Sequence, residues 1–163
     1  MLSLLSLPVL AGPTIFGMEL GKMTEKELKD KYNVNRAGTN KYSDGNMYSV
    51  PVSSIKFEGL QEVTAIFSKD GQLVGVLTTL HKKKFDYLKK ILDGKYKRVS
   101  QKTPFVGNKE AIYRAGDTEI LLTSHHLSFK MSMNYINDDL MQVFNRQSEA
   151  EAHQKQQGEA SQL

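Results

Sequence analysis

The chain has 163 residues, with no cysteine, no tryptophan and only four prolines. The absence of cysteine excludes disulfide bonds, thiolate zinc sites, a cysteine nucleophile and lipid attachment through an N-terminal cysteine. No apolar run approaches the roughly 18 residues that a membrane-spanning helix needs. We therefore expect no membrane span and a fold that is stabilised by packing alone.

The first eleven residues have the composition of an export signal. Six of the nine residues from 2 to 10 are aliphatic, none is charged, and Pro8 shortly precedes a small residue, Ala11. This pattern predicts a signal peptide over residues 1–11, cut after Ala11, and a periplasmic or secreted product. Signal peptides begin with Lys or Arg, whereas the first charge here is Glu19, so we expect the true translation start to lie further upstream. A buried N-terminal strand or helix is the alternative.

The net charge of +4 is unevenly distributed. Residues 137–163 are acidic, whereas the 22 residues from 81 to 102 hold nine cations and two acids. A basic surface can bind an anionic envelope component or a protein partner, and export makes nucleic acid an unexpected target. A solvated helix face is the alternative. The candidate binding residues are Lys82, Lys83, Lys84, Lys89, Lys90, Lys95, Lys97, Arg98 and Phe105.

Phe105 and Val106 lie in an apparent loop beside this basic stretch. An exposed Phe gains nothing without a partner, so we expect Phe105 to fold back over the sheet edge. If the two side chains are exposed instead, they form a contact point.

Local patterns predict helices and hairpins in alternation. Thr24 and Glu27 have capping-box spacing and predict a helix from about Thr24 to Tyr32. A second helix is expected from Lys82, with Gly94 as the residue that follows it. A third helix is expected to begin at Asn137 or Asp138 and to fray beyond Arg146. The expected strands or strand pairs are 47–50, 55–57, the hairpin 63–67 and 73–77, 96–100, the hairpin 111–114 and 119–122, and the alternating stretch 127–135.

This order predicts an α+β fold with a mainly antiparallel sheet of about six to seven strands, two helices packed on one face and a C-terminal helix. We expect a single domain over residues 12–146 and a polar tail over 147–163. Leu28 to Tyr32 and Leu92 to Tyr96 share Leu, Lys and Tyr at matching positions, which hints at two helix-plus-sheet halves, 12–80 and 81–136. Two unrelated helix ends explain the same identities.

Residues 17–28, Gly-Met-Glu-Leu-Gly-Lys-Met-Thr-Glu-Lys-Glu-Leu, have a glycine, a threonine and polar residues at the start of a helix. This opening resembles that of the SmpA/BamE family of small outer-membrane lipoproteins, and the resemblance extends over about residues 17–99. It implies a helix packed on an antiparallel sheet. The chain lacks the lipidated cysteine of that family and has a longer second half.

The sequence contains no pattern typical of a metal, cofactor or nucleophile site. His125 and His126 are adjacent and would point to opposite faces of a strand, and no phosphate-binding or dinucleotide glycine motif occurs, so we expect neither metal nor cofactor. Glu58 with Glu62, or Asp117 with Glu119, could form an acid/base pair. The leading interpretation is a non-enzymatic, exported binding or inhibitor-type protein. The alternatives are a small periplasmic hydrolase with a site assembled from dispersed residues and a structural subunit of an envelope complex.

Overall fold

A computed structural model describes residues 12–163 of the chain; the expected signal peptide, residues 1–11, lies outside the described residues. The short N-terminal elements are β1 (Thr14–Ile15), β2 (Met18–Glu19) and α1 (Glu25–Lys31). The first half of the main sheet comprises β3 (Asn35–Thr39), β4 (Asp44–Ser49), β5 (Leu60–Ser68) and β6 (Leu73–His81), with the 3-10 turn η1 (Val52–Ser54). The second half comprises η2 (Lys82–Lys84), α2 (Phe85–Lys95), β7 (Lys97–Lys102), β8 (Lys109–Ala115), β9 (Thr118–Ser124), β10 (Lys130–Asn137) and α3 (Asp138–Ala160).

Within residues 12–163 the main sheet has eight strands, all paired antiparallel, in the order β3-β4-β5-β6-β10-β9-β8-β7. It consists of two four-stranded meanders, one following α1 and the other following α2. The meanders join where β6 pairs with β10. Because that central pair is antiparallel, corresponding turns of the two meanders leave opposite ends of the sheet: the β3–β4 and β5–β6 turns leave one end, and the β7–β8 and β9–β10 loops leave the other.

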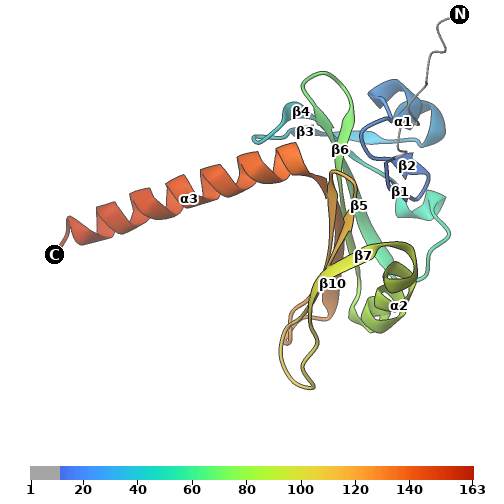
Figure 1. The fold of residues 1–163 in the computed structure, drawn as a ribbon. Helices are drawn as coiled ribbons and strands as arrows, with labels where there is room; N and C mark the ends of the chain where they lie inside the picture. The colour runs from blue at the N-terminus through green and yellow to red at the C-terminus, as the bar shows by residue number, and fades with distance from the viewer. Residues whose placement is uncertain (1–11) are drawn as a thin grey trace, which may run out of the picture.

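The hydrophobic core lies between one face of this sheet and the helices α1 and α2, which Figure 1 shows on the same side. Leu28 of α1 and Leu88 and Leu92 of α2 are buried against strand residues in one cluster. The strands supply this cluster at every second position, as Met131 and Met133 of β10 illustrate. Period-two alternation therefore gives the sheet a buried face and a second face with half-buried side chains.

The helix α3 leaves the opposite side of the sheet and extends away from it (Figure 1). Asn137 caps it, because its Oδ1 accepts a 2.9 Å hydrogen bond from the backbone N–H of Asp139. Leu140 is buried near Gly75 of β6, where a Cβ would lie 3.2 Å from the leucine Cδ2 atom. In the described chain no helix is both long and apolar enough to cross a bilayer.

The α+β class, the mainly antiparallel sheet and the C-terminal helix are confirmed. The capping box of Thr24 and Glu27 is present, and Asp70 and Gly71 turn the first predicted hairpin, where Gly71 has a φ of +82°. The expected strand count of six to seven was wrong, because the described sheet has eight strands; β3 forms within residues 33–46, whose Asn, Gly, Lys and Ser content indicates a loop with at most one short strand.

Three smaller expectations were also wrong. Residues 55–57 are outside the strands, since Pro51 is followed by the η1 turn. Gly94 lies inside α2, which continues to Lys95 and ends where the Tyr96 N–H reaches the Leu92 carbonyl. Residues 147–160 continue α3 instead of fraying.

Candidate functional site

Four large apolar side chains protrude from two loops at the end of the second meander. We call them the apolar tip: Phe105, Val106, Leu127 and Phe129, whose relative exposures are 103, 65, 91 and 83%. The first pair lies in the β7–β8 loop (103–108) and the second in the β9–β10 loop (125–129). Soluble proteins rarely leave several large apolar side chains together in water without a contact that uses them. The expected packing of Phe105 against the sheet edge was wrong.

The two loops are held together by backbone and side-chain hydrogen bonds. They leave the sheet side by side, since Lys109 and Ser124 are paired at the end of the β8–β9 ladder. The His126 N–H donates to Asn108 Oδ1 over 2.8 Å. Lys82 fixes the second loop from η2: its backbone N–H donates to the Phe129 carbonyl over 2.9 Å, and its ammonium donates to the His126 carbonyl over 2.7 Å. The β9–β10 loop is thus fixed at several points, and Asn108 is the point at which the β7–β8 loop is joined to it.

The first meander offers an internal comparison for these loops. By strand order, its β3–β4 turn (40–43) and β5–β6 turn (69–72) correspond to the two tip loops. The β3–β4 turn is Asn-Lys-Tyr-Ser, and its Tyr42 packs edge-on against Phe144. The β5–β6 turn is Lys-Asp-Gly-Gln. The corresponding hairpins of the first meander therefore form with no Phe, Leu or Val in their turns, which indicates that hairpin formation does not require the apolar residues of the tip.

Lysines surround the base of the tip. Lys102, Lys109 and Lys130 lie at the strand ends from which the loops leave, and Lys82 lies beside them. Among the described residues, Lys82, Lys102 and Lys130 form no salt bridge, and Lys109 meets Asp86 at 3.9 Å. No acidic residue occurs over 94–109 or 120–137. Glu110 is the cross-strand neighbour of Lys102, so the unpaired positive charge at this end of the molecule lies mainly at Lys82 and Lys130, beside the apolar projection.

The predicted basic surface is divided by the fold. Lys83 and Lys84 contact Glu58 at 3.2 and 3.9 Å, and the Lys84 ammonium lies 5.4 Å from the ring centre of Phe57 and 5.0 Å from that of Tyr87. With its side chain only 15% exposed, Lys84 contributes little free charge. The predicted cations without a salt bridge in the described chain are Lys82, Lys90, Lys95 and Lys97. That the predicted set binds a partner stays a prediction.

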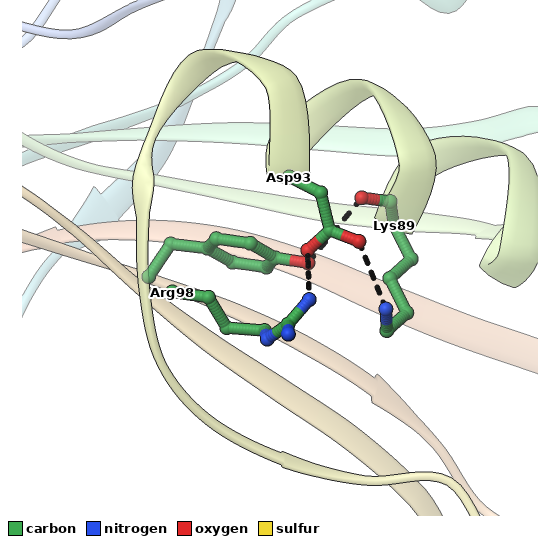
Figure 2. Close-up of polar contacts among 4 residues, drawn as sticks. Lys89, Asp93 and Arg98 are labelled. Carbon is green, nitrogen blue, oxygen red and sulfur yellow. Dashed lines mark hydrogen bonds and ion pairs between the residues drawn. The ribbon is translucent and has the colours of Figure 1, made fainter.

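Lys89 and Arg98 converge on Asp93, as Figure 2 shows. Their nitrogens lie 2.9 and 2.7 Å from the carboxylate oxygens, and the Tyr113 hydroxyl donates to the same carboxylate over 2.8 Å. The hydrogen bond from Lys89, with those from Tyr113 and Arg98, lowers the pKa of Asp93 to about 2, and burial raises the pKa of Tyr113. The carboxylate accepts hydrogen bonds from three side chains, so this cluster joins the end of α2 to β7 and β8.

A mainly apolar pocket of about 560 Å³ lies between the first turns of α3 and the half-buried face of the sheet. Leu77, Leu121 and Phe144 are among its lining residues, together with Glu119. Glu119 contacts Arg114 at 3.7 Å, whereas Asp117 lies in the exposed β8–β9 turn. Both carboxylates lie near the Arg114 guanidinium, whose pKa is raised chiefly by its hydrogen bond to Asp138 and also by Glu119 and Asp117.

His125 and His126 lie exposed in the β9–β10 loop. Over residues 12–163, no group of three or more His, Asp or Glu side chains is arranged to hold a metal ion.

Leu127 and Phe129 are the tip residues that sequence reasoning missed. Leu127 and Phe129 alternate with Ser128 and Lys130 in the same period of two as the residues of β10, which predicts that both are buried on the core face of that strand. The strand begins only at Lys130, however. The Ser128 N–H bonds to the His125 carbonyl at 3.2 Å, forming a turn that directs both apolar side chains into solvent. The adjacent histidines and Ser128 were the only signal of that turn.

Comparisons of the chain with models of protein families, with curated proteins and with solved structures found no match. The resemblance to the SmpA/BamE family stays a prediction.

Proposed function

We propose that this protein is an exported, non-enzymatic binding or inhibitor-type protein that contacts its partner through the apolar tip. The observation that carries the proposal is the exposure of Phe105, Val106, Leu127 and Phe129 on two hydrogen-bonded loops. A rigid apolar projection with a polar surround is typical of the centre of a binding surface. The proposed contact keeps the predicted Phe105 loop, adds the neighbouring β9–β10 loop and takes these loops, not the Lys82 to Lys102 surface, as its centre.

Export is supported by the aliphatic, uncharged composition of residues 1–11. It can be tested in a Gram-negative host that expresses the chain as printed and, separately, with two lysines inserted after Met1. N-terminal sequencing of the periplasmic product should find Gly12 first in at least the lysine variant. Recovery of both forms from the cytoplasm with Met1 intact would overturn the export assignment.

Tip binding is tested by the recovery of envelope material on immobilised protein. The Phe105→Ser/Phe129→Ser double variant should lose recovery while keeping the native melting temperature, because both side chains are exposed. The matched control, Lys90→Glu/Lys95→Glu/Lys97→Glu, reverses three of the four free charges of the predicted basic surface, leaves Lys82 to hold the β9–β10 loop, and should retain recovery. Equal recovery by the native protein and the tip variant would overturn the proposal, and loss in the charge variant alone would restore the basic-surface hypothesis.

A further inference from the structure

We propose that the partner of the apolar tip is an anionic phospholipid surface, into which the tip inserts while the surrounding lysines contact the headgroups. This inference rests on the proposed function, because it takes the tip as the contact. It adds the chemical class of the partner and the orientation of the protein on it.

The shape of the tip favours a deformable partner. Phe105, Leu127 and Phe129 are almost fully exposed, so they stand out from the surface instead of lying flat on it. A folded protein would need a preformed cavity for each projecting side chain. The boundary between headgroups and acyl chains accepts such side chains without a matching shape.

The charges around the tip favour an anionic lipid. Lys82, Lys102 and Lys130 form no salt bridge among residues 12–163, and neither tip loop contains a carboxylate, although Glu110 is the cross-strand neighbour of Lys102. The Lys82 ammonium is held by the carbonyls of His125 and His126, which position its charge without neutralising it. Basic residues beside an inserting apolar element add electrostatic attraction to anionic headgroups.

The loops are already ordered for insertion. The bond from the Lys82 N–H to the Phe129 carbonyl fixes the β9–β10 loop in the free protein, and the Asn108–His126 hydrogen bond joins the β7–β8 loop to it. Binding then requires little additional ordering of the chain, which favours a measurable affinity from a small contact.

The absence of tryptophan provides a direct test with the intact protein. Phe129→Trp places a single fluorophore at the tip, and Lys69→Trp places one in the corresponding β5–β6 turn at the opposite end of the sheet. Vesicles of phosphatidylglycerol mixed with phosphatidylcholine should shift the Phe129→Trp emission to the blue and leave the Lys69→Trp emission unchanged. Vesicles of phosphatidylcholine alone should give a much smaller shift at Phe129→Trp.

Vesicle co-sedimentation separates the two contributions. Phe105→Ser/Phe129→Ser should weaken partitioning about tenfold or more, because apolar burial is lost. Lys102→Gln and Lys130→Gln should each weaken it about fivefold at low salt, with a smaller effect at high salt.

Failure to bind anionic vesicles, or binding that persists in the Phe105→Ser/Phe129→Ser variant, would overturn the lipid assignment. Tip-dependent capture of a soluble envelope protein without vesicle binding would overturn it while leaving the proposed function intact. Vesicle binding with an unshifted Phe129→Trp emission would overturn insertion of the tip.

Discussion

The backbone N–H of His126 donates a 2.8 Å hydrogen bond to the Oδ1 atom of Asn108 and thereby joins the β9–β10 loop to the β7–β8 loop. The bond crosses between two hairpins whose strands are neighbours in the sheet. It makes the four side chains of the apolar tip parts of one structural unit. Loss of this bond should therefore increase the local motion of the tip loops while the stability of the whole fold changes little.

Asn108→Ala should increase amide hydrogen exchange in residues 125–129 about fivefold, which corresponds to the roughly 1 kcal/mol of one hydrogen bond. The melting temperature should change little, because Asn108 is exposed. Exchange measured by mass spectrometry checks this, with Asn145→Ala as the control on an exposed asparagine of α3. Unchanged exchange in residues 125–129 would show that the side-chain bond does not hold the loop.

Asp93→Asn should lower the free energy of unfolding at neutral pH by about 1 kcal/mol, because the amide cannot accept charge-assisted bonds from both Lys89 and Arg98. The pKa of Asp93 is about 2 in the folded protein, against an ordinary value of 3.8. A lowered folded-state pKa stabilises the protein above about pH 4, and this contribution is lost as the pH falls towards 2.

Denaturant unfolding of the native protein and of Asp93→Asn across this range measures the difference directly. The gap in unfolding free energy between the two should narrow as the pH falls from about 4 to about 2. Glu149→Gln, on the exposed surface of α3, should follow the native curve. A gap that stays constant with pH would contradict the depressed pKa.

Thr24→Ala should destabilise the protein by about 1 kcal/mol, since it removes the hydroxyl that caps α1. The Thr24 hydroxyl accepts from the Glu27 N–H at 3.3 Å, and the Glu27 carboxylate accepts from the Thr24 N–H at 2.7 Å. Thr24→Ser should restore most of the loss in a thermal unfolding measurement. Thr14→Ala, at an exposed strand position, serves as the control, and an equal effect there would contradict a capping role.

The extent to which sequence predicts this protein depends on how local each signal is. The capping box of Thr24 and the turn at Asp70-Gly71 are complete within a few residues, so spacing alone predicts them. The strand β3 is not predictable in this way, because Asn35 to Thr39 have poor strand propensity and are held by pairing with β4.

The candidate site was predicted only in part for the same reason. Phe105 was identified as a candidate from its position in a loop. Leu127 and Phe129 continue the apolar alternation of β10 in the sequence, but the turn at Ser128 places them outside the strand. Likewise, the number of charges in the basic stretch could not show that Asp93 forms ion pairs with both Lys89 and Arg98. The pair with Arg98 depends on the position of β7 beside the end of α2, which is a tertiary contact.

Leu140 anchors α3 on the sheet, and its replacement should test how the helix is held. Leu140 is the only buried residue of α3 within the described chain, and it packs where Gly75 leaves no Cβ. Leu140→Ala should lower the free energy of unfolding by about 2 kcal/mol and increase amide exchange over the first turns of α3.

Gly75→Ala provides the second half of a double-mutant cycle. Alone, it should destabilise the protein, because its Cβ would lie 3.2 Å from the Leu140 Cδ2 atom and would force that side chain to move by a few tenths of an ångström. In the Leu140→Ala background, the added methyl group occupies space that the leucine has left, so the same substitution should cost less. Denaturant unfolding of all four proteins measures the coupling. Additive effects would mean that α3 is held by contacts other than the one between Leu140 and Gly75.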